Sequence, residues 1–65
     1  RTWPAIVVEE NSQYVTMSLP KEQIIVRVPR QLFGEKVFLG SWYQLRMGKI
    51  DPLNNEIKIA QVLEE

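Results

Sequence analysis

The chain has 65 residues, 45% of them hydrophobic, and its eight basic side chains balance eight acidic ones. This length suits one domain, and the apolar content is too high for a disordered tail. The sequence contains no Cys or His, which excludes disulfides, the usual zinc ligands and catalysis by thiol or imidazole groups. We therefore expect a protein that is not an enzyme and that holds no metal and no cofactor. Because the chain begins with Arg1, we expect residues 1–65 to be a single domain of a larger protein.

The first two predicted strands are short and rich in β-branched residues. Residues 5–8 form an apolar run between Pro4 and a polar stretch, which predicts a strand followed by a turn. Residues 14–19 alternate between apolar and polar side chains, as is typical of a strand with one buried face. Pro20 ends this strand because proline has no N–H to donate to a ladder.

The third strand is predicted at residues 24–28, which alternate again and stop at Pro29. Residues 31–36 are the only stretch that could make a helical turn, and they are too short for an independent helix. We expect Leu32 and Phe33 in this spacer to close one end of the core.

The last two strands are predicted at residues 41–49 and 56–60, joined by a turn at 51–55. The turn contains Asp-Pro and Asn-Asn, whose side chains and ring favour tight reversal of the backbone. Gly48, inside the fourth strand, predicts a bulge or bend.

Five short strands with one apolar face each would leave two edges and an open face if the sheet were flat. Closure into a small five-stranded barrel removes both problems. OB-like and SH3- or Tudor-like barrels are the common solutions, and the spacer between the third and fourth strands favours the OB-like one. The side chains expected inside the barrel are Ile6, Val8, Val15, Met17, Ile24, Val26, Val28, Leu45, Met47, Ile57 and Ile59.

Residues 24–60 resemble the second half of an S1-type or other OB-fold domain. The segments that carry the resemblance are 25–29, 31–33, 39–45, 49–51 and 57–60. They match a Val-x-Val-Pro-like strand end, a plug, a fourth strand introduced by Gly, an Asp-containing turn and a fifth strand. S1 domains usually have glycines and an aromatic pair in strands two and three, whereas this chain has no Gly before Gly34. The resemblance implies an OB-like barrel and RNA binding.

A binding surface is the remaining source of function. Alternation and charge single out a set of aromatic, basic and apolar residues: Tyr14, Ile25, Arg27, Arg30, Trp42, Arg46 and Lys49. Nucleic-acid bases stack on exposed rings while cations follow the phosphates. The same residue types anchor protein interfaces, and they also occur on plain structural surfaces.

We therefore predict a non-catalytic module that binds single-stranded RNA or DNA through an aromatic and basic barrel face. The alternative is a barrel for protein–protein or intramolecular interaction within a larger assembly. The neutral net charge argues against duplex DNA and membrane surfaces, and no apolar run is long enough to cross a membrane. We expect an intracellular location and no membrane partner. The ligand and the oligomeric state stay open.

Overall fold

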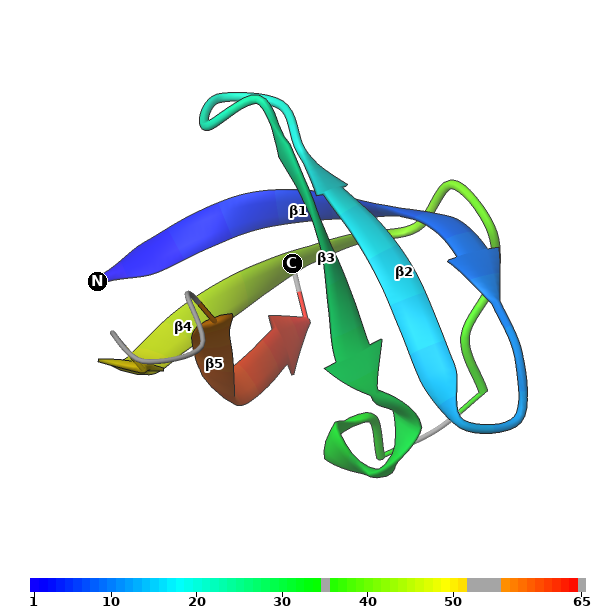
Figure 1. The fold of residues 1–65 in the computed structure, drawn as a ribbon. Coiled ribbons are helices and arrows are strands. Elements are labelled where there is room, and N and C mark those ends of the chain that lie inside the picture. Colours follow the sequence, from blue (N-terminus) through cyan, green and yellow to red (C-terminus); the bar gives the residue numbers. More distant parts are fainter. Residues whose placement is uncertain (35, 52–55, 65) are drawn as a thin grey trace.

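The computed structural model describes residues 1–34, 36–51 and 56–64, with side chains described except at 49–51 and 56–58. The strands are β1 (Thr2–Glu10), β2 (Tyr14–Leu19), β3 (Ile24–Pro29), β4 (Trp42–Asp51) and β5 (Glu56–Glu64) (Figure 1). A short 3₁₀ helix, η1 (Arg30–Leu32), follows β3. The prediction of an all-β fold with five strands is confirmed. Among the described residues, no helix has the length and apolar character needed to cross a membrane. The turn predicted at 51–55 falls mostly on residues 52–55, outside the described part.

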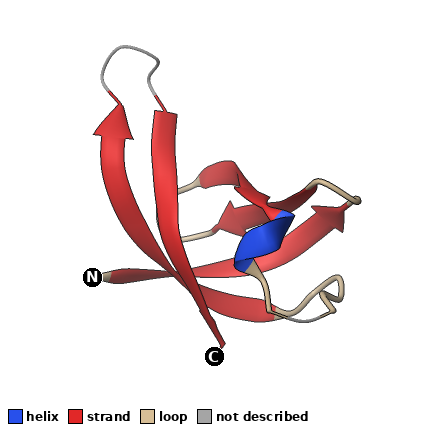
Figure 2. Cartoon of the chain, turned by 90° about the horizontal axis from the view of Figure 1, so that it is seen from below, coloured by secondary structure: helices blue, strands red, loops and turns tan. Residues whose placement is uncertain are grey.

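The strands form one antiparallel sheet in the order β3-β2-β1-β4-β5. Figure 2 shows that this sheet curls into a half-barrel. In the part of the chain that is described, β3 and β5 are its two edges, so the sheet stops short of the closed barrel. The loop after η1 covers the core instead. Val37 from this loop is buried, and the Phe33 ring meets Tyr43 edge-on, with centroids 5.1 Å apart and planes at 86°.

The core follows the period-two patterns of β2, β3 and β4. Val15, Met17 and Leu19 of β2 have no exposed surface, and they belong to the same buried cluster as Tyr43 and Leu45 of β4. The predicted core residues that are buried or pack against the core are Val15, Met17, Ile24, Val26, Val28, Leu45, Met47 and Ile59. Ile57 was also predicted to be inside, and its side chain lies outside the described residues.

The prediction for β1 was wrong about which face is buried. Ala5 and Val7 point into the core, whereas Ile6 is only half-buried and Val8 is 47% exposed. The pairing explains this result, because Val7 lies opposite Met17 and the next partner on β1 is Glu9, which leaves Val8 in a bulge. Four consecutive apolar residues do not define a face, so the sequence pattern could not choose between the two registers.

Gly40 lies where the loop before β4 is hydrogen-bonded to β1, and its backbone is left-handed, with φ of 84°. Its N–H donates to the Val7 carbonyl at 2.8 Å, and the Val7 N–H donates to the Ser41 carbonyl at 3.0 Å. We expect Gly40→Ala to lower the free energy of unfolding by about 1 kcal/mol, because an L side chain is strained at this φ. Urea denaturation measures the change. Gly34→Ala is the matched control, since its Cβ would meet open space; equal losses for the two variants would contradict the argument.

Candidate functional site

The outer face of the sheet carries a row of side chains that crosses four strands. Ile25 on β3 lies opposite Ser18 on β2, and Ser18 lies opposite Ile6 on β1. Ile6 in turn lies opposite Trp42 on β4. The ends of the row are the exposed members, with Ile25 68% and Trp42 44% exposed. The register therefore places two predicted site residues on one face and connects them through Ser18 and Ile6.

A second pair of predicted residues lies on the same face, at the beginning of β2. Tyr14 lies opposite Pro29, and Thr16 lies opposite Arg27, so Tyr14 and Arg27 are diagonal neighbours. Diagonal neighbours on adjacent strands are within reach of aromatic and long side chains. Both side chains are exposed, and Arg27 makes no ion pair or hydrogen bond with the described residues. The structure thus brings one ring and one available cation together.

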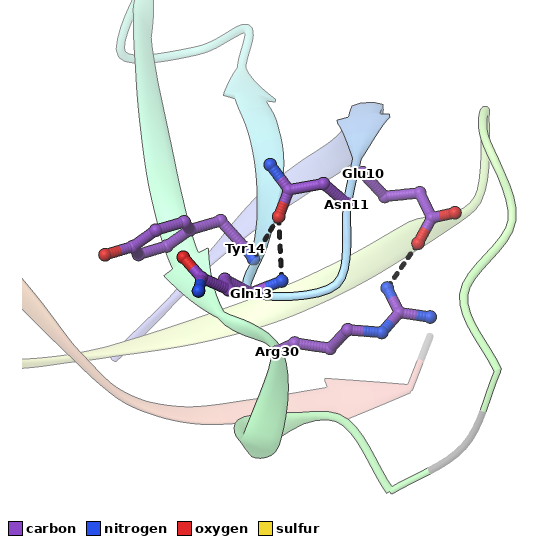
Figure 3. Close-up of polar contacts among 5 residues, drawn as sticks. All are labelled: Glu10, Asn11, Gln13, Tyr14 and Arg30. Carbon is purple, nitrogen blue, oxygen red and sulfur yellow. Dashed lines mark hydrogen bonds and ion pairs between the residues drawn. The ribbon is translucent and has the colours of Figure 1, made fainter.

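The turn before β2 is organised by Asn11, which the sequence analysis did not single out. Its Oδ1 accepts hydrogen bonds from the backbone N–H groups of Gln13 at 2.8 Å and Tyr14 at 2.7 Å (Figure 3). The Asn11 N–H donates to the Tyr14 carbonyl at 2.9 Å. An Asn that bonds the backbone two and three residues later is a local turn signal. This side chain positions Tyr14 at the edge of the outer face.

Arg30, another predicted site residue, has contacts that join separate elements of the fold. Its guanidinium forms an ion pair with the Glu10 carboxylate, which offsets its charge. In Figure 3 the Arg30 guanidinium and the Tyr14 ring point to opposite sides of the chain. The Arg30 N–H also donates to the Gln13 carbonyl at 3.0 Å, which ties η1 to the β1–β2 turn. Arg30 therefore joins structural elements, and its guanidinium points away from the Tyr14 ring.

Two shallow hollows border the exposed rings. The first, of about 640 Å³, is lined by Ser12, Gln13, Tyr14, Pro29, Arg30 and Gln31. The second, of about 520 Å³, is lined by Thr2, Pro4, Pro20, Lys21, Trp42 and Gln44. The first hollow thus combines the Tyr14 ring with the amide groups of Gln13 and Gln31, and the second combines the Trp42 ring with that of Gln44.

The hollows are separate sites on one surface. Tyr14 and Ser18 are four residues apart on β2, which corresponds to about 14 Å along the strand. Trp42 lies two strands away from Ser18, or about 10 Å across the sheet. The two aromatic positions are therefore about 17 Å apart, measured along the sheet. A ligand that contacts both must be extended.

Of the other predicted residues, Arg46 lines neither hollow. Arg46 is exposed on β4 opposite Thr2, four residues beyond Trp42 and away from β2 and β3. The side chain of Lys49 is outside the described residues. The structure adds an exposed pair, Phe38 and Leu39, in the loop before β4, at 62% and 66% exposed. No alternation applies in a loop, so the sequence carried no signal for their exposure.

Within the described part of the chain, no three His, Cys, Asp or Glu side chains come together as metal ligands would. No protein-family model matches this chain, and no curated protein and no solved structure is significantly similar to it. The arguments for function therefore come from the surface alone.

Proposed function

We propose that this domain binds single-stranded nucleic acid across the outer face of its sheet and catalyses no reaction. The observation that carries the proposal is the pair of hollows, each bordered by an exposed ring. Arg27 lies beside Tyr14, and Lys21 lines the hollow at Trp42. Stacking of a base on such a ring contributes about 1–3 kcal/mol, and neighbouring cations contact the phosphates.

The curled sheet supports the OB-like interpretation of the fold. OB-folds are partly open five-stranded barrels that bind oligonucleotides on the face of strands two and three and on the loop between strands one and two. Tyr14 and Arg27 lie on that face, and Asn11 organises that loop. The neutral net charge is consistent with a short contact on few phosphates, where stacking contributes more than the electrostatic attraction.

The fluorescence of Trp42 tests this function directly. Trp3 is half-buried against the core, so Trp3→Phe keeps the packing and leaves Trp42 as the only tryptophan. We expect mixed-sequence single-stranded DNA or RNA at low salt to quench Trp42, and a labelled strand to gain anisotropy. Duplex DNA is the control and should bind more weakly, because its bases are not free to stack. No quenching and no anisotropy change with either single strand at low salt would refute the proposal.

The salt dependence of binding distinguishes the cations. We expect Arg27→Gln to reduce the slope of log affinity against log salt by about 0.7, the value for one phosphate contact on a single strand. Arg46→Gln should change the slope less, because Arg46 lines neither hollow. Anisotropy titrations at several salt concentrations measure both slopes. A larger change for Arg46→Gln than for Arg27→Gln would show that the phosphates do not follow β2 and β3.

A protein partner is the second candidate, and the apolar row favours it. Ile25, Ile6 and Trp42 lie in one row, which Ser18 interrupts between the two Ile side chains. Buried Trp side chains are frequent anchors of protein interfaces. This candidate predicts that the wild-type domain binds no oligonucleotide at low salt. The fluorescence titration above therefore separates the two functions.

A further inference from the structure

The β3 edge of the sheet is unusually open to strand pairing. Four of its six residues are Ile or Val, and it pairs with β2 in a continuous register without a shift. The β5 edge differs, because its sequence contains Glu56, Lys58 and Glu64 and its pairing with β4 has two register shifts. Charges and irregularities are the features that protect edge strands from pairing with other chains. Of the two edges, β3 has less of this protection, because Arg27 is its one charged residue and its pairing has no register shift.

Side chains on both faces of β3 are incompletely buried. Two of its three inward side chains, Ile24 and Val26, are only half-buried, whereas Val28 and the inward residues of neighbouring β2 have no exposed surface. On the outer face, Ile25 has the largest exposed fraction, 68%, among the described large hydrophobic side chains. A further strand beside β3 would cover apolar surface on both faces.

The hydrogen-bond pattern shows which backbone groups such a strand would meet. In antiparallel pairs, residues that bond to the neighbouring strand alternate with residues that do not. The Arg30 N–H donates to the Gln13 carbonyl, so the even-numbered residues of β3 bond to β2. The N–H and C=O groups of Ile25 and Arg27 are therefore directed toward the open edge.

We propose that two copies of this chain pair antiparallel through β3, with Val26 at the two-fold axis. This register places Ile25 opposite the partner's Arg27, so that the outward backbone groups of both residues bond across the interface. The inward faces then meet as apolar pairs, and the two half-barrels form one continuous sheet. This inference is independent of the proposed nucleic-acid binding.

The alternative symmetric registers are less favourable. A two-fold axis at Arg27 would place two Arg side chains directly opposite each other, which destabilises a strand pair. It would also pair Ile25 with the partner's Pro29, which has no N–H. An axis at Ile25 would require Gln23 to pair as part of the strand with the partner's Arg27. The Gln23 backbone is not extended, because its φ of 58° is left-handed. Among the symmetric registers, the residues of β3 thus favour the one with Val26 at the two-fold axis.

Opposite charges at Ile25 test both the dimer and the register. By sedimentation equilibrium, we expect the wild-type chain to dimerise as its concentration rises. Ile25→Lys should lower the association constant about tenfold, because two symmetric Lys–Arg pairs then repel. Ile25→Glu should leave association unchanged or stronger, because the carboxylate faces the partner's Arg27. A wild-type chain that stays monomeric, or equal weakening by both charges, would overturn the proposal.

A backbone variant tests the hydrogen bonds themselves. Arg27→Pro removes an N–H that points to the open edge, where proline is tolerated, and should abolish the dimer. Arg27→Ala keeps the N–H and should retain it. Dimerisation of a folded Arg27→Pro chain would overturn the proposal. Because Ile25 is exposed, its two charge variants keep the fold and decide the question even where the proline variant does not fold.

Discussion

Met17→Asp should leave this domain unfolded at room temperature. Met17 has no exposed surface and lies on β2 between Val7 of β1 and Val26 of β3. An unpaired carboxylate at this position costs more than a neutral polar group, which itself costs roughly 2–7 kcal/mol. A core of this size supplies only about 3–5 kcal/mol in total. Loss of the β signal in circular dichroism, without a thermal transition, is the expected result.

Two further variants control this experiment. Thr16→Asp changes the neighbouring residue on the outer face and should stay folded, because half-buried Thr16 faces away from the core and lies opposite Arg27. Val26→Asp should destabilise less than Met17→Asp, since Val26 is half-buried at the open edge. The comparison belongs at low protein concentration, where pairing through β3 does not cover Val26. Equal loss of structure from Met17→Asp and Val26→Asp would mean that the β3 edge is covered within one chain.

The sequence predicted the strands well where apolar and polar residues alternate. Met17 and Leu45 were assigned to the correct face because period two leaves only one choice. Ile6 and Val8 were assigned to the wrong face because the run at residues 5–8 has no polar member to mark the outside. A bulge adds one residue to a strand, and only the partner strand shows where.

The sequence also could not predict how far the sheet closes, for a similar reason. The patterns show that each strand has an apolar face, but not what covers it. Val37 and Phe33 supply part of the cover from a loop, so β3 and β5 need not meet for the core to be buried. Alternation also ranks Met17 and Val26 as equals, whereas the position of each strand in the sheet makes one central and the other peripheral.

Five of the predicted site residues lie on the outer face but do not form one cluster: Tyr14, Ile25, Arg27, Trp42 and Arg46. Tyr14 and Arg27 are neighbours because β2 and β3 form a hairpin, which a sequence can indicate. Trp42 reaches the same face through the pairing of β1 with β4, a long-range contact that no local pattern encodes. The ion pair of Arg30 with Glu10 likewise joins residues distant in sequence.

Tyr14→Ala should weaken oligonucleotide binding by about 1–3 kcal/mol while the domain stays folded. The ring is exposed and the rest of its hollow is formed by polar residues and Pro29, so its removal leaves no cavity in the core. Tyr14→Phe keeps the ring and should retain most of the affinity. Phe38→Ala is the matched control, because Phe38 is an exposed ring that borders neither hollow. An equal loss for Phe38→Ala would show that binding is not confined to the outer face.

The double variant of Tyr14 and Trp42 tests the geometry of the two hollows. Positions about 17 Å apart share no partner, and the effects of changes more than 7–10 Å apart usually add within about 0.5 kcal/mol. For an oligonucleotide long enough to contact both rings, the loss of binding free energy in the double variant should therefore equal the sum of the two single losses. A short strand that covers only one hollow should respond to one substitution at a time. Strong non-additivity with the long oligonucleotide would mean that both rings contact the same base. That result would contradict the geometry, because β1 separates β2 from β4 in the sheet.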